Sequence, residues 1–385
     1  MYSLLPDPKK NRNLLERASI ERDGEQQNMN GNSHTWREIQ QQPALWPTTA
    51  ARVREGMERL QVQARLKNAR VIITGAGTSA YAAAAVAAAW PRSVAVPSTD
   101  LLLATERYVE DATVLLSLGR SGDSPESMAV VERVHRLRPE MWHLAVTCNP
   151  RGGLANSSLV NAIVLDPRTN DESLVMTSSF SNLLLAGLCL AKGDCMGPVI
   201  ALAVAAAQAK FALIHDCMRT LANRIEDRVL FLASPSLFGW AQEGALKVLE
   251  MTAGRFPVMA ETYLGLRHGP MSFVRRDTQV ICLVSNDRES RAYEEDLVRE
   301  LGVKQLGHLV GICNDDSSDN GIKLLFDEVI PSLLPQTPDD MRTPFEILGA
   351  QLLGYHLSLR EGLNPDNPSP GGVINRVAQG IRIYH

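Results

Sequence analysis

The amino-acid sequence predicts an α/β protein made of two related units, each a parallel sheet flanked by helices. Short apolar, β-branched runs alternate with helical segments, as in parallel strands that are covered on both faces. Two strand candidates in the first half are each followed by a glycine-containing loop and a helix. The strand motif His143–Asn149 also returns as His308–Asn314, 165 residues later (308 − 143).

The first unit is expected to follow a polar N-terminal extension, residues 1–34, whose composition is typical of disorder. A helical lead-in then spans 36–66, with interruptions expected at Pro43 and Pro47. Later elements alternate between strands and helices. The strands are predicted at 70–74, 113–118, 143–148 and 162–165, and the helices from about Ala80 and from Pro125.

The second unit repeats this order with different loops. Strands are predicted at 228–231, 278–283 and 308–314, and helices at 242–252 and about 290–301. The loop that corresponds to Gly75–Ser79 is Ala233–Leu237, which contains no glycine. We therefore expect a first domain over 35–215, a second over 216–385 with a C-terminal tail, and one composite site to which each contributes differently.

Composition narrows the functional classes. The 385 residues carry a formal net charge of −4 and only 5% aromatic residues, so a basic or base-stacking nucleic-acid binder is not expected. The six cysteines are scattered without metal-site spacing, which indicates free thiols in the cytoplasm and predicts neither a metal nor another cofactor. No run reaches the roughly 18 apolar residues of a membrane helix, so no membrane association is expected.

Two loops of the first half predict a phosphate site. Gly75–Ser79 and Gly119–Ser124 each end at a helix N-terminus, where free N–H groups and the helix dipole favour an anion. A third hydroxyl cluster, Thr177–Ser179, also precedes a helix. Neither loop fits a dinucleotide or P-loop motif, so a phosphomonoester is favoured, with simple helix capping as the alternative. The candidate residues are Gly77, Ser79, Arg120, Ser121, Ser124, Thr177 and Ser178.

Candidate acid/base residues occur in the second half. Glu243, Lys247 and Glu250 share one face of the helix over 242–252, an arrangement that suits either proton transfer or a solvated row of ion pairs. His268 lies in the loop Arg267–Pro270, where it is either a proton shuttle or a structural histidine.

These motifs together resemble the sugar isomerase (SIS) family, whose tandem domains have a flavodoxin-like fold. More specifically they resemble its AgaS branch of galactosamine-6-phosphate deaminase/isomerases, formerly tagatose-6-phosphate ketose/aldose isomerases. The resemblance extends from about Thr35 to the C-terminus. It is carried by Thr74–Ala80, Pro97–Leu101, Ser121–Ser127, Met176–Ser179, Glu243–Gly254, Gly265–Pro270, Asn364–Pro368 and Asn375–Gly380.

The resemblance implies a role for each candidate. Ser121 and Ser124 would bind the sugar phosphate, with Ser79 and Thr177 or Ser178 close to the sugar. Glu250 would be the general base between C1 and C2, with Lys247 and Glu243 lining the site. His268 would assist ring opening from the neighbouring subunit, as in the related glucosamine-6-phosphate synthase, which implies a homodimer or a higher homo-oligomer.

Two departures separate the chain from that synthase. Gly265 stands where the synthase has a glutamate, and Asn375–Arg376 falls near its C-terminal Schiff-base lysine. The absence of that lysine fits a substrate that already carries its amine. We therefore expect a deaminating isomerase that converts galactosamine 6-phosphate to tagatose 6-phosphate and ammonia. The alternatives are a glucosamine-6-phosphate deaminase, a plain phosphosugar isomerase and, from another class, a non-catalytic sugar-phosphate sensor.

Overall fold

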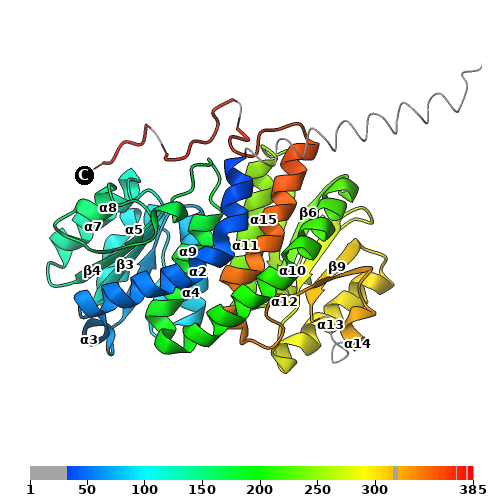
Figure 1. Cartoon of the computed structure of the whole chain (residues 1–385), viewed down its shortest axis with the longest axis horizontal. Coiled ribbons are helices and arrows are strands. Elements are labelled where there is room, and N and C mark those ends of the chain that lie inside the picture. The colour runs from blue at the N-terminus through cyan, green and yellow to red at the C-terminus, as the bar shows by residue number, and fades with distance from the viewer. Residues whose placement is uncertain (1–32, 315–319, 370, 379, 385) are drawn as a thin grey trace, which may run out of the picture.

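The computed structural model describes residues 33–314, 320–369, 371–378 and 380–384, which form two five-stranded parallel sheets flanked by helices (Figure 1). The first sheet has the order β2-β1-β3-β4-β5, and the second has the order β10-β9-β8-β6-β7. Counted from the first strand of each unit, both orders read 2-1-3-4-5. The predicted fold class is confirmed, and each predicted strand is present with its ends within two residues of the expected ones.

The strands of the first sheet are β1 Val71–Thr74, β2 Ser93–Ala95, β3 Val114–Gly119, β4 Trp142–Thr147 and β5 Asn161–Val164. Those of the second are β6 Val229–Ala233, β7 Val258–Thr262, β8 Gln279–Leu283, β9 His308–Cys313 and β10 Glu328–Pro331. The first residues of the neighbouring central strands are paired in both sheets, Val71 with Val114 and Val229 with Gln279. All these pairings are parallel, so the carboxyl ends of the strands meet at one edge of each sheet.

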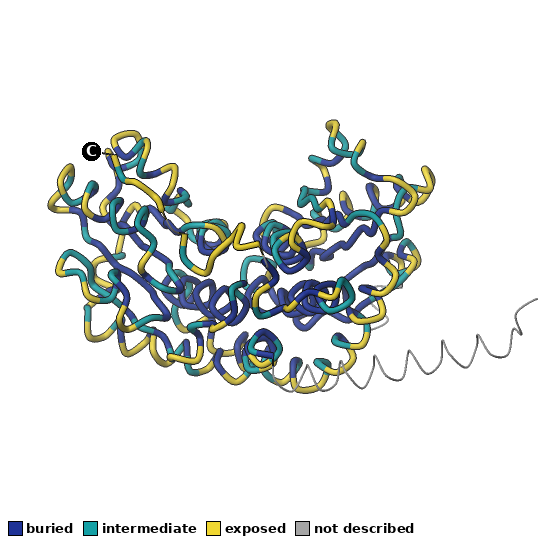
Figure 2. The backbone as a smooth tube through the Cα atoms, turned by 90° about the horizontal axis from the view of Figure 1, so that it is seen from above, coloured by how far each residue is buried: buried dark blue, intermediate teal, exposed yellow. Residues whose placement is uncertain are grey.

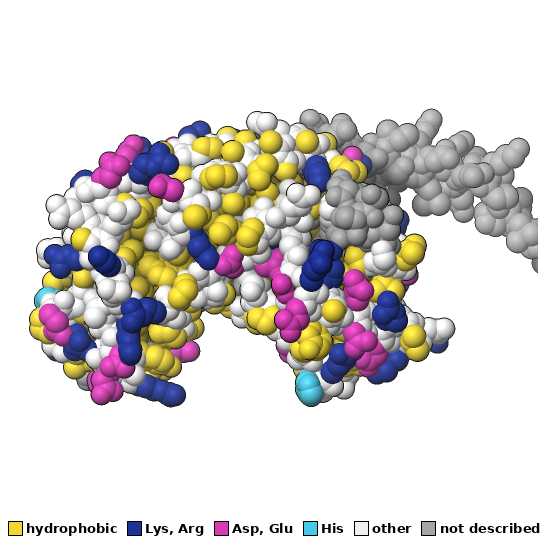
Figure 3. Space-filling view, turned by 90° about the horizontal axis from the view of Figure 1, so that it is seen from below, with side chains coloured by type: hydrophobic (Ala, Val, Ile, Leu, Met, Phe, Trp, Pro, Cys, Tyr) yellow, Lys and Arg dark blue, Asp and Glu magenta, His cyan; other side chains and the backbone are white. Residues whose placement is uncertain are grey.

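A layer of helices lies between the two sheets and joins the lobes (Figure 1). It contains α2 His34–Arg59, α4 Thr78–Ala89, α9 Ser178–Lys192, α10 Met196–Arg224, α11 Phe238–Met251 and α15 Thr343–Arg360. The residues of this layer and of the sheets are the most buried part of the chain (Figure 2). The space-filling view in Figure 3 shows the molecule hollowed between its two lobes.

The remaining helices belong to the outer parts of the lobes and to the connections. The α-helices are α3 Val62–Leu66, α5 Ser98–Leu103, α6 Thr105–Val109, α7 Pro125–Leu137, α8 Gly153–Asn156, α12 Tyr263–Leu266, α13 Arg288–Val303 and α14 Asn320–Lys323. The 3-10 helices are η1 Pro167–Thr169, η2 Gly193–Cys195, η3 Pro235–Leu237, η4 Pro270–Phe273 and η6 Asp339–Met341.

The alanine-rich composition of α4 has a packing explanation. This helix contacts α9 of its own lobe and α11 of the other. At Gly239 in α11, an added Cβ would lie only 2.6 Å from the Cβ of Ala85. Two helix backbones can approach this closely only where both side chains are small. The short side chains therefore bring the N-terminus of α4 close to the acid/base helix.

The expected interruption of the lead-in helix is wrong. Helix α2 continues through both Pro43 and Pro47. Proline cannot donate to the carbonyl four residues earlier, but the side-chain Nε2 of Gln42 donates to the Ile39 carbonyl at 3.3 Å in place of Pro43. Trp46, fully buried, packs edge-on against Phe345 of α15 with ring centroids 4.8 Å apart. Tertiary packing thus outweighs the local cost of the prolines.

By length and composition alone, the stretch Ser178–Arg224 could cross a membrane. Its mean hydropathy stays high although it contains a few polar residues. It folds as α9 and α10 beside the other central helices. In α9, residues 178–190 are all buried, whereas only 28% of the most apolar 18-residue window of the stretch is buried. The expected boundary between residues 215 and 216 lies inside α10. The six cysteines form no disulfide.

Candidate functional site

A small cavity lies at the carboxyl edge of the first sheet, where the loops after β1 and β3 meet. These two strands are neighbours, and the chain leaves them toward opposite sides of the sheet. Open α/β sheets bind ligands in the crevice that forms at such a point. The cavity has a volume of about 220 Å³. It is lined by six of the residues selected from the sequence, namely Gly77, Ser79, Arg120, Ser121, Ser124 and Glu250.

Glycine is required at two positions of these loops. Gly77, just before α4, has φ +56° and ψ −129°, a conformation that side-chain-bearing residues rarely adopt. Gly122 has φ +68°, and a Cβ there would lie 3.1 Å from Thr147 Oγ1. The two glycines let the loops turn sharply into α4 and α7, whose first residues, among them Thr78, Ser79 and Glu126, line the cavity.

The hydroxyl groups of the second loop have partners within the loop. Ser124 Oγ donates to Glu126 Oε2 at 2.7 Å, and Ser121 Oγ accepts from the main-chain N–H of Asp123 at 3.2 Å. Ser124 therefore does not cap α7 with its side chain, in contrast to the expected Ser cap. Glu126 lines the same cavity, and its role was not foreseen from the sequence. A bound phosphate would compete with Glu126 for the Ser124 hydroxyl.

The second lobe supplies an acid/base group through α11. Glu250 lines the cavity, whereas Lys247 and Glu243 are fully buried behind it. Lys247 Nζ lies 2.7 Å from Glu250 Oε2 and 3.1 Å from Glu243 Oε1. The solvated row of ion pairs, which the sequence left open, is therefore excluded.

Two residues of the first lobe complete the environment of Lys247. Its Nζ donates to Thr78 Oγ1 at 3.2 Å and to the Met176 carbonyl at 3.1 Å. Neither residue was selected from the sequence, although Thr78 lies in the glycine loop and Met176 in the Met176–Ser179 motif. The buried lysine thus ties the glycine loop, the Met176 segment and the acid/base helix together.

Burial sets the charge of this cluster. Glu243 is enclosed without access to water, and this desolvation raises its pKa to about 8 despite the nearby lysine. Desolvation opposes the charge on Lys247, but Glu243 and Glu250 outweigh it and raise the pKa of that ammonium group. Two carboxylates share one cation here. The proton belongs on Glu243, because the Glu250 side chain is 24% exposed and the Glu243 side chain is not exposed at all.

The third hydroxyl cluster lies behind the cavity wall. Thr177 and Ser178 are fully buried and do not line the cavity. The buried carboxylate of Asp171 accepts hydrogen bonds from the main-chain N–H groups of Thr177 (2.8 Å) and Ser179 (2.9 Å), so it caps α9. In this arrangement the cluster positions the Met176 segment without contacting the cavity.

His268 is the candidate that the single chain does not bring to the cavity. It is exposed in the loop between α12 and η4, and it is not among the lining residues. Its neighbour Arg267 forms ion pairs with Asp296 (3.0 Å) and Glu300 (2.7 Å) of α13, which fixes the loop on the outer part of the second lobe. The structure therefore places Glu250 and His268 in different environments.

The C-terminal tail forms a further wall of the cavity. Residues Ile374–Ala378 lie along it, beside the loop that contains Arg120. The motif Asn375–Gly380 marked this segment in the sequence, but nothing in that pattern indicated where the segment lies.

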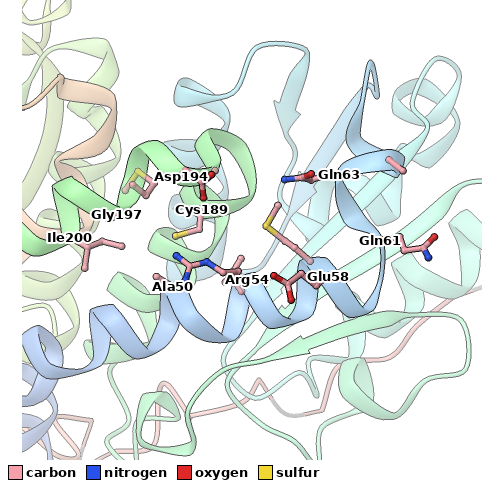
Figure 4. A pocket seen from close by; sticks show the side chains of 14 residues that line it. Ala50, Arg54, Glu58, Gln61, Gln63, Cys189, Asp194, Gly197 and Ile200 are labelled. Carbon is pink, nitrogen blue, oxygen red and sulfur yellow. The ribbon is translucent and has the colours of Figure 1, made fainter.

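A larger cavity lies elsewhere and contains none of the candidates. It has a volume of about 600 Å³ and lies between α2 and the α9–α10 corner (Figure 4). Side chains such as Arg54, Cys189 and Ile200 line it (Figure 4). It holds no glycine loop at a strand end and no acid/base pair, so the smaller cavity is the candidate active site.

Comparison with known proteins gives relatives over nearly the whole chain, although no family model matches it. A Shewanella protein (strain ANA-3) named D-galactosamine-6-phosphate deaminase AgaS is 34% identical over 380 residues, 91% of each chain. The crystal structure of tagatose-6-phosphate ketose/aldose isomerase from Escherichia coli matches with a TM-score of 0.80 and 29% identity, covering 93% of this chain and 98% of that one. The C-terminal domain of glucosamine-fructose-6-phosphate aminotransferase from Francisella tularensis matches with a TM-score of 0.71, covering 88% and 98%; at 17% identity it shows the fold alone.

Proposed function

The chain belongs to the AgaS family of D-galactosamine-6-phosphate deaminases, and from that premise we propose that it converts galactosamine 6-phosphate to tagatose 6-phosphate and ammonia. The observation that carries this proposal is the position of Glu250. Its carboxylate faces a cavity that has phosphate-type loops on one side and a buried lysine behind it. A sugar phosphate held by the loops would place its reacting carbons within reach of this one carboxylate.

The chemistry requires one proton transfer and one hydrolysis. In the open-chain aldehyde, Glu250 removes the C2 proton, the aldehyde oxygen takes up a proton, and Glu250 returns its proton to C1. The product is a C2 ketimine with a hydroxyl group on C1. Water adds to C2, the C2–N bond breaks, and ammonia leaves the ketose 6-phosphate. Lys247 holds the carboxylate in place, because two of its four acceptor groups, on Thr78 and Met176, belong to other segments of the chain and fix the ammonium group.

The phosphate is assigned to the loops that contain Ser121 and Ser124. The hydroxyl groups, the main-chain N–H groups at the starts of α4 and α7, and buried Arg120 give this wall of the cavity a preference for an anion. Such contacts act equally on the ground state and the transition state, so they orient the substrate while Glu250 provides the rate.

Ring opening is assigned to His268 of a second copy of the chain. The exposure of His268 and its absence from the cavity of its own chain favour a site completed across a symmetric dimer. Mixing Glu250→Gln chains with His268→Ala chains tests this arrangement. Each variant alone should be inactive, while random pairing should restore about one quarter of wild-type activity, since half of the dimers carry one intact site of two. A mixture as inactive as its components would exclude the shared site.

The cytoplasm is the proposed compartment, because six cysteines that form no disulfide in the described chain fit a reducing environment. The reaction itself is tested by ammonia release from galactosamine 6-phosphate, glucosamine 6-phosphate and their N-acetyl forms. We expect release from galactosamine 6-phosphate at the highest kcat/KM and none from the N-acetyl sugars. Faster release from glucosamine 6-phosphate would assign the gluco substrate instead. Isomerisation without ammonia release would indicate a plain isomerase, and binding without turnover would indicate a sensor.

A further inference from the structure

The C-terminal tail crosses from the second lobe to the first and passes over the proposed phosphate site. After α15 ends at Arg360, the carboxylate of Asp366 accepts from Ser33 Oγ (2.7 Å) and from the N–H groups of His34 (2.9 Å) and Thr35 (2.8 Å). This fixes the first part of the tail on the N-terminus of α2. The following residues, Ile374–Ala378, line the cavity.

The distal part of the tail is hydrogen-bonded to the first lobe through one residue. Among the described residues, the hydrogen bonds that join residues 371–384 to the first lobe involve Arg376, while Gly372 and Ile374 donate to Ser369 of the tail itself, and Ile383 and Tyr384 lie against α5–α7. Its Nε donates to the Asp171 carbonyl at 3.0 Å, and its Nη2 donates to the same carbonyl and to Asn170 Oδ1 at 2.8 Å. Its own carbonyl accepts from Arg120 Nη2. With so few hydrogen bonds to the first lobe, loss of the Arg376 contacts should free the residues beside the cavity.

Arg120 connects this attachment to the phosphate loop. It is the residue before Ser121, only 6% exposed, and its Nη1 donates to the carbonyls of Ser173 (3.2 Å) and Leu174 (3.0 Å). Arg120 and Arg376 thus hold the segment 170–174 from two sides, and Arg120 holds the tail as well. We call Arg120, Arg376 and segment 170–174 the tail latch.

We propose that the tail latch closes residues 374–378 over the sugar-phosphate pocket and that a bound phosphate group stabilises the closed position. A phosphate on Ser121 and Ser124 fixes the loop from which Arg120 extends, and a fixed Arg120 holds the carbonyl of Arg376 more firmly. By thermodynamic reciprocity, a closed tail then increases affinity for the phosphate. Arg376 is accordingly a positioning residue, since its guanidinium is directed at the segment 170–171. This inference rests on the proposed sugar-phosphate substrate.

Limited digestion of the full chain with trypsin measures closure without requiring turnover. Arg376 is exposed, but its guanidinium is held by Asp171 and Asn170, so trypsin can bind this side chain and cut the Arg376–Val377 bond only when these contacts break. Mass spectrometry separates this cut from the one after Arg382. We expect inorganic phosphate and galactosamine 6-phosphate to slow the cut after Arg376 by at least about fivefold, and unphosphorylated galactosamine to leave it unchanged. Equal rates with and without phosphate would overturn the proposal.

The variant Arg376→Lys keeps the charge and the trypsin site but loses the paired donors to the Asp171 carbonyl and Asn170. It should raise KM for galactosamine 6-phosphate about tenfold, keep kcat within about twofold, and lose most of the phosphate protection. Arg382→Lys is the matched control: Arg382 lies in the same tail, is exposed, and contacts only the ring of Tyr384 among the described residues, so it should behave as wild type.

The outcomes separate the latch from the reaction. If no amino-sugar phosphate releases ammonia but inorganic phosphate still slows the cut after Arg376, the proposed reaction fails and the latch stands. If ammonia is released while Arg376→Lys retains wild-type KM and the cut is insensitive to phosphate, the latch is wrong.

Discussion

The two sheets share a strand order but use the same edge in different ways. At the carboxyl ends of β1 and β3, the glycine loops leave a cavity of about 220 Å³. At the corresponding ends of β6 and β8, a carboxylate of the protein occupies the space. Glu294 of α13 accepts from Ser234 Oγ at 2.6 Å and from the Ser285 N–H at 2.8 Å. The second lobe thus places one of its own carboxyl groups where the first lobe is open to a ligand.

The surroundings of Glu294 strengthen this comparison. Ser285 also donates its hydroxyl to Asp339, whose other carboxylate oxygen pairs with fully buried Arg342 at 2.8 Å. Ser234, Ser285 and the Nη1 of Arg342 thus each donate to an acceptor within the lobe, whereas the buried Nε of Arg342 has no partner among the described residues. A parallel sheet offers the same N–H groups and helix starts in both lobes, and only the residues that follow the strands decide whether an anion from solution can bind. The difference also explains why the second lobe contributes to the proposed active site through α11 and not through its strand ends.

The largest expected difference is in kcat, between substitution of Glu250 at the cavity of the first sheet and substitution of Glu294 at the edge of the second. Glu250→Gln should lower kcat about 10³-fold, because the amide cannot accept the C2 proton, while KM stays within a few-fold. Glu294→Gln should keep kcat within about twofold, since its carboxylate has only a structural partner set. Steady-state ammonia release measures both, with exposed Glu132→Gln as the control. Retention of most of the kcat by Glu250→Gln would remove it as the base.

The sequence was sufficient for the parts of this comparison that depend on local pattern. The strands, the glycine loops and the shared face of Glu243, Lys247 and Glu250 follow from spacing and residue type. Spacing could not show that Lys247 is buried, because its other partners, Thr78 and Met176, come from the opposite lobe. That information exists only in the folded chain.

The same limit applies to the tail and to the lead-in helix. The route of the tail is set by Asp366 on the N-terminus of α2 and by Arg376 on segment 170–171, contacts between residues more than 200 positions apart. The prolines of α2 were expected to interrupt it, and packing against α15 overrides them. Long-range contacts, and not weak local signals, account for what the sequence did not reveal.

A smaller effect concerns the pH dependence of stability that the buried Glu294 gives to the second edge. Burial raises the pKa of Glu294 to about 7. The folded state therefore keeps a proton that the unfolded state has lost above its ordinary value of 4.5, and the stability that this carboxyl contributes falls as the pH rises from 4.5 through 7. Glu294→Gln removes this loss.

The difference in the free energy of unfolding between wild type and Glu294→Gln should change by up to about 1.4 kcal/mol per pH unit between the unfolded-state and folded-state pKa values of Glu294. Urea unfolding at several pH values between 5 and 8 measures it, with exposed Glu289→Gln as the matched substitution on the same helix. Parallel stability curves for wild type and Glu294→Gln would contradict a buried, protonated Glu294.

The smallest effect concerns the serine that stands two positions after each central strand, Ser121 after β3 and Ser285 after β8. Ser121→Ala should raise KM about tenfold with kcat nearly unchanged, because the hydroxyl binds the phosphate in both the ground state and the transition state. Ser285→Ala should leave KM within about twofold but lower the free energy of unfolding by about 1–2 kcal/mol, because Asp339 loses a buried donor. The first variant thus tests whether the edge of the first sheet binds the substrate phosphate, and the second tests whether the edge of the second sheet binds carboxyl groups of the protein. An unchanged KM in Ser121→Ala, or a raised KM in Ser285→Ala, would mean that the division between an open and a self-occupied edge is drawn in the wrong place.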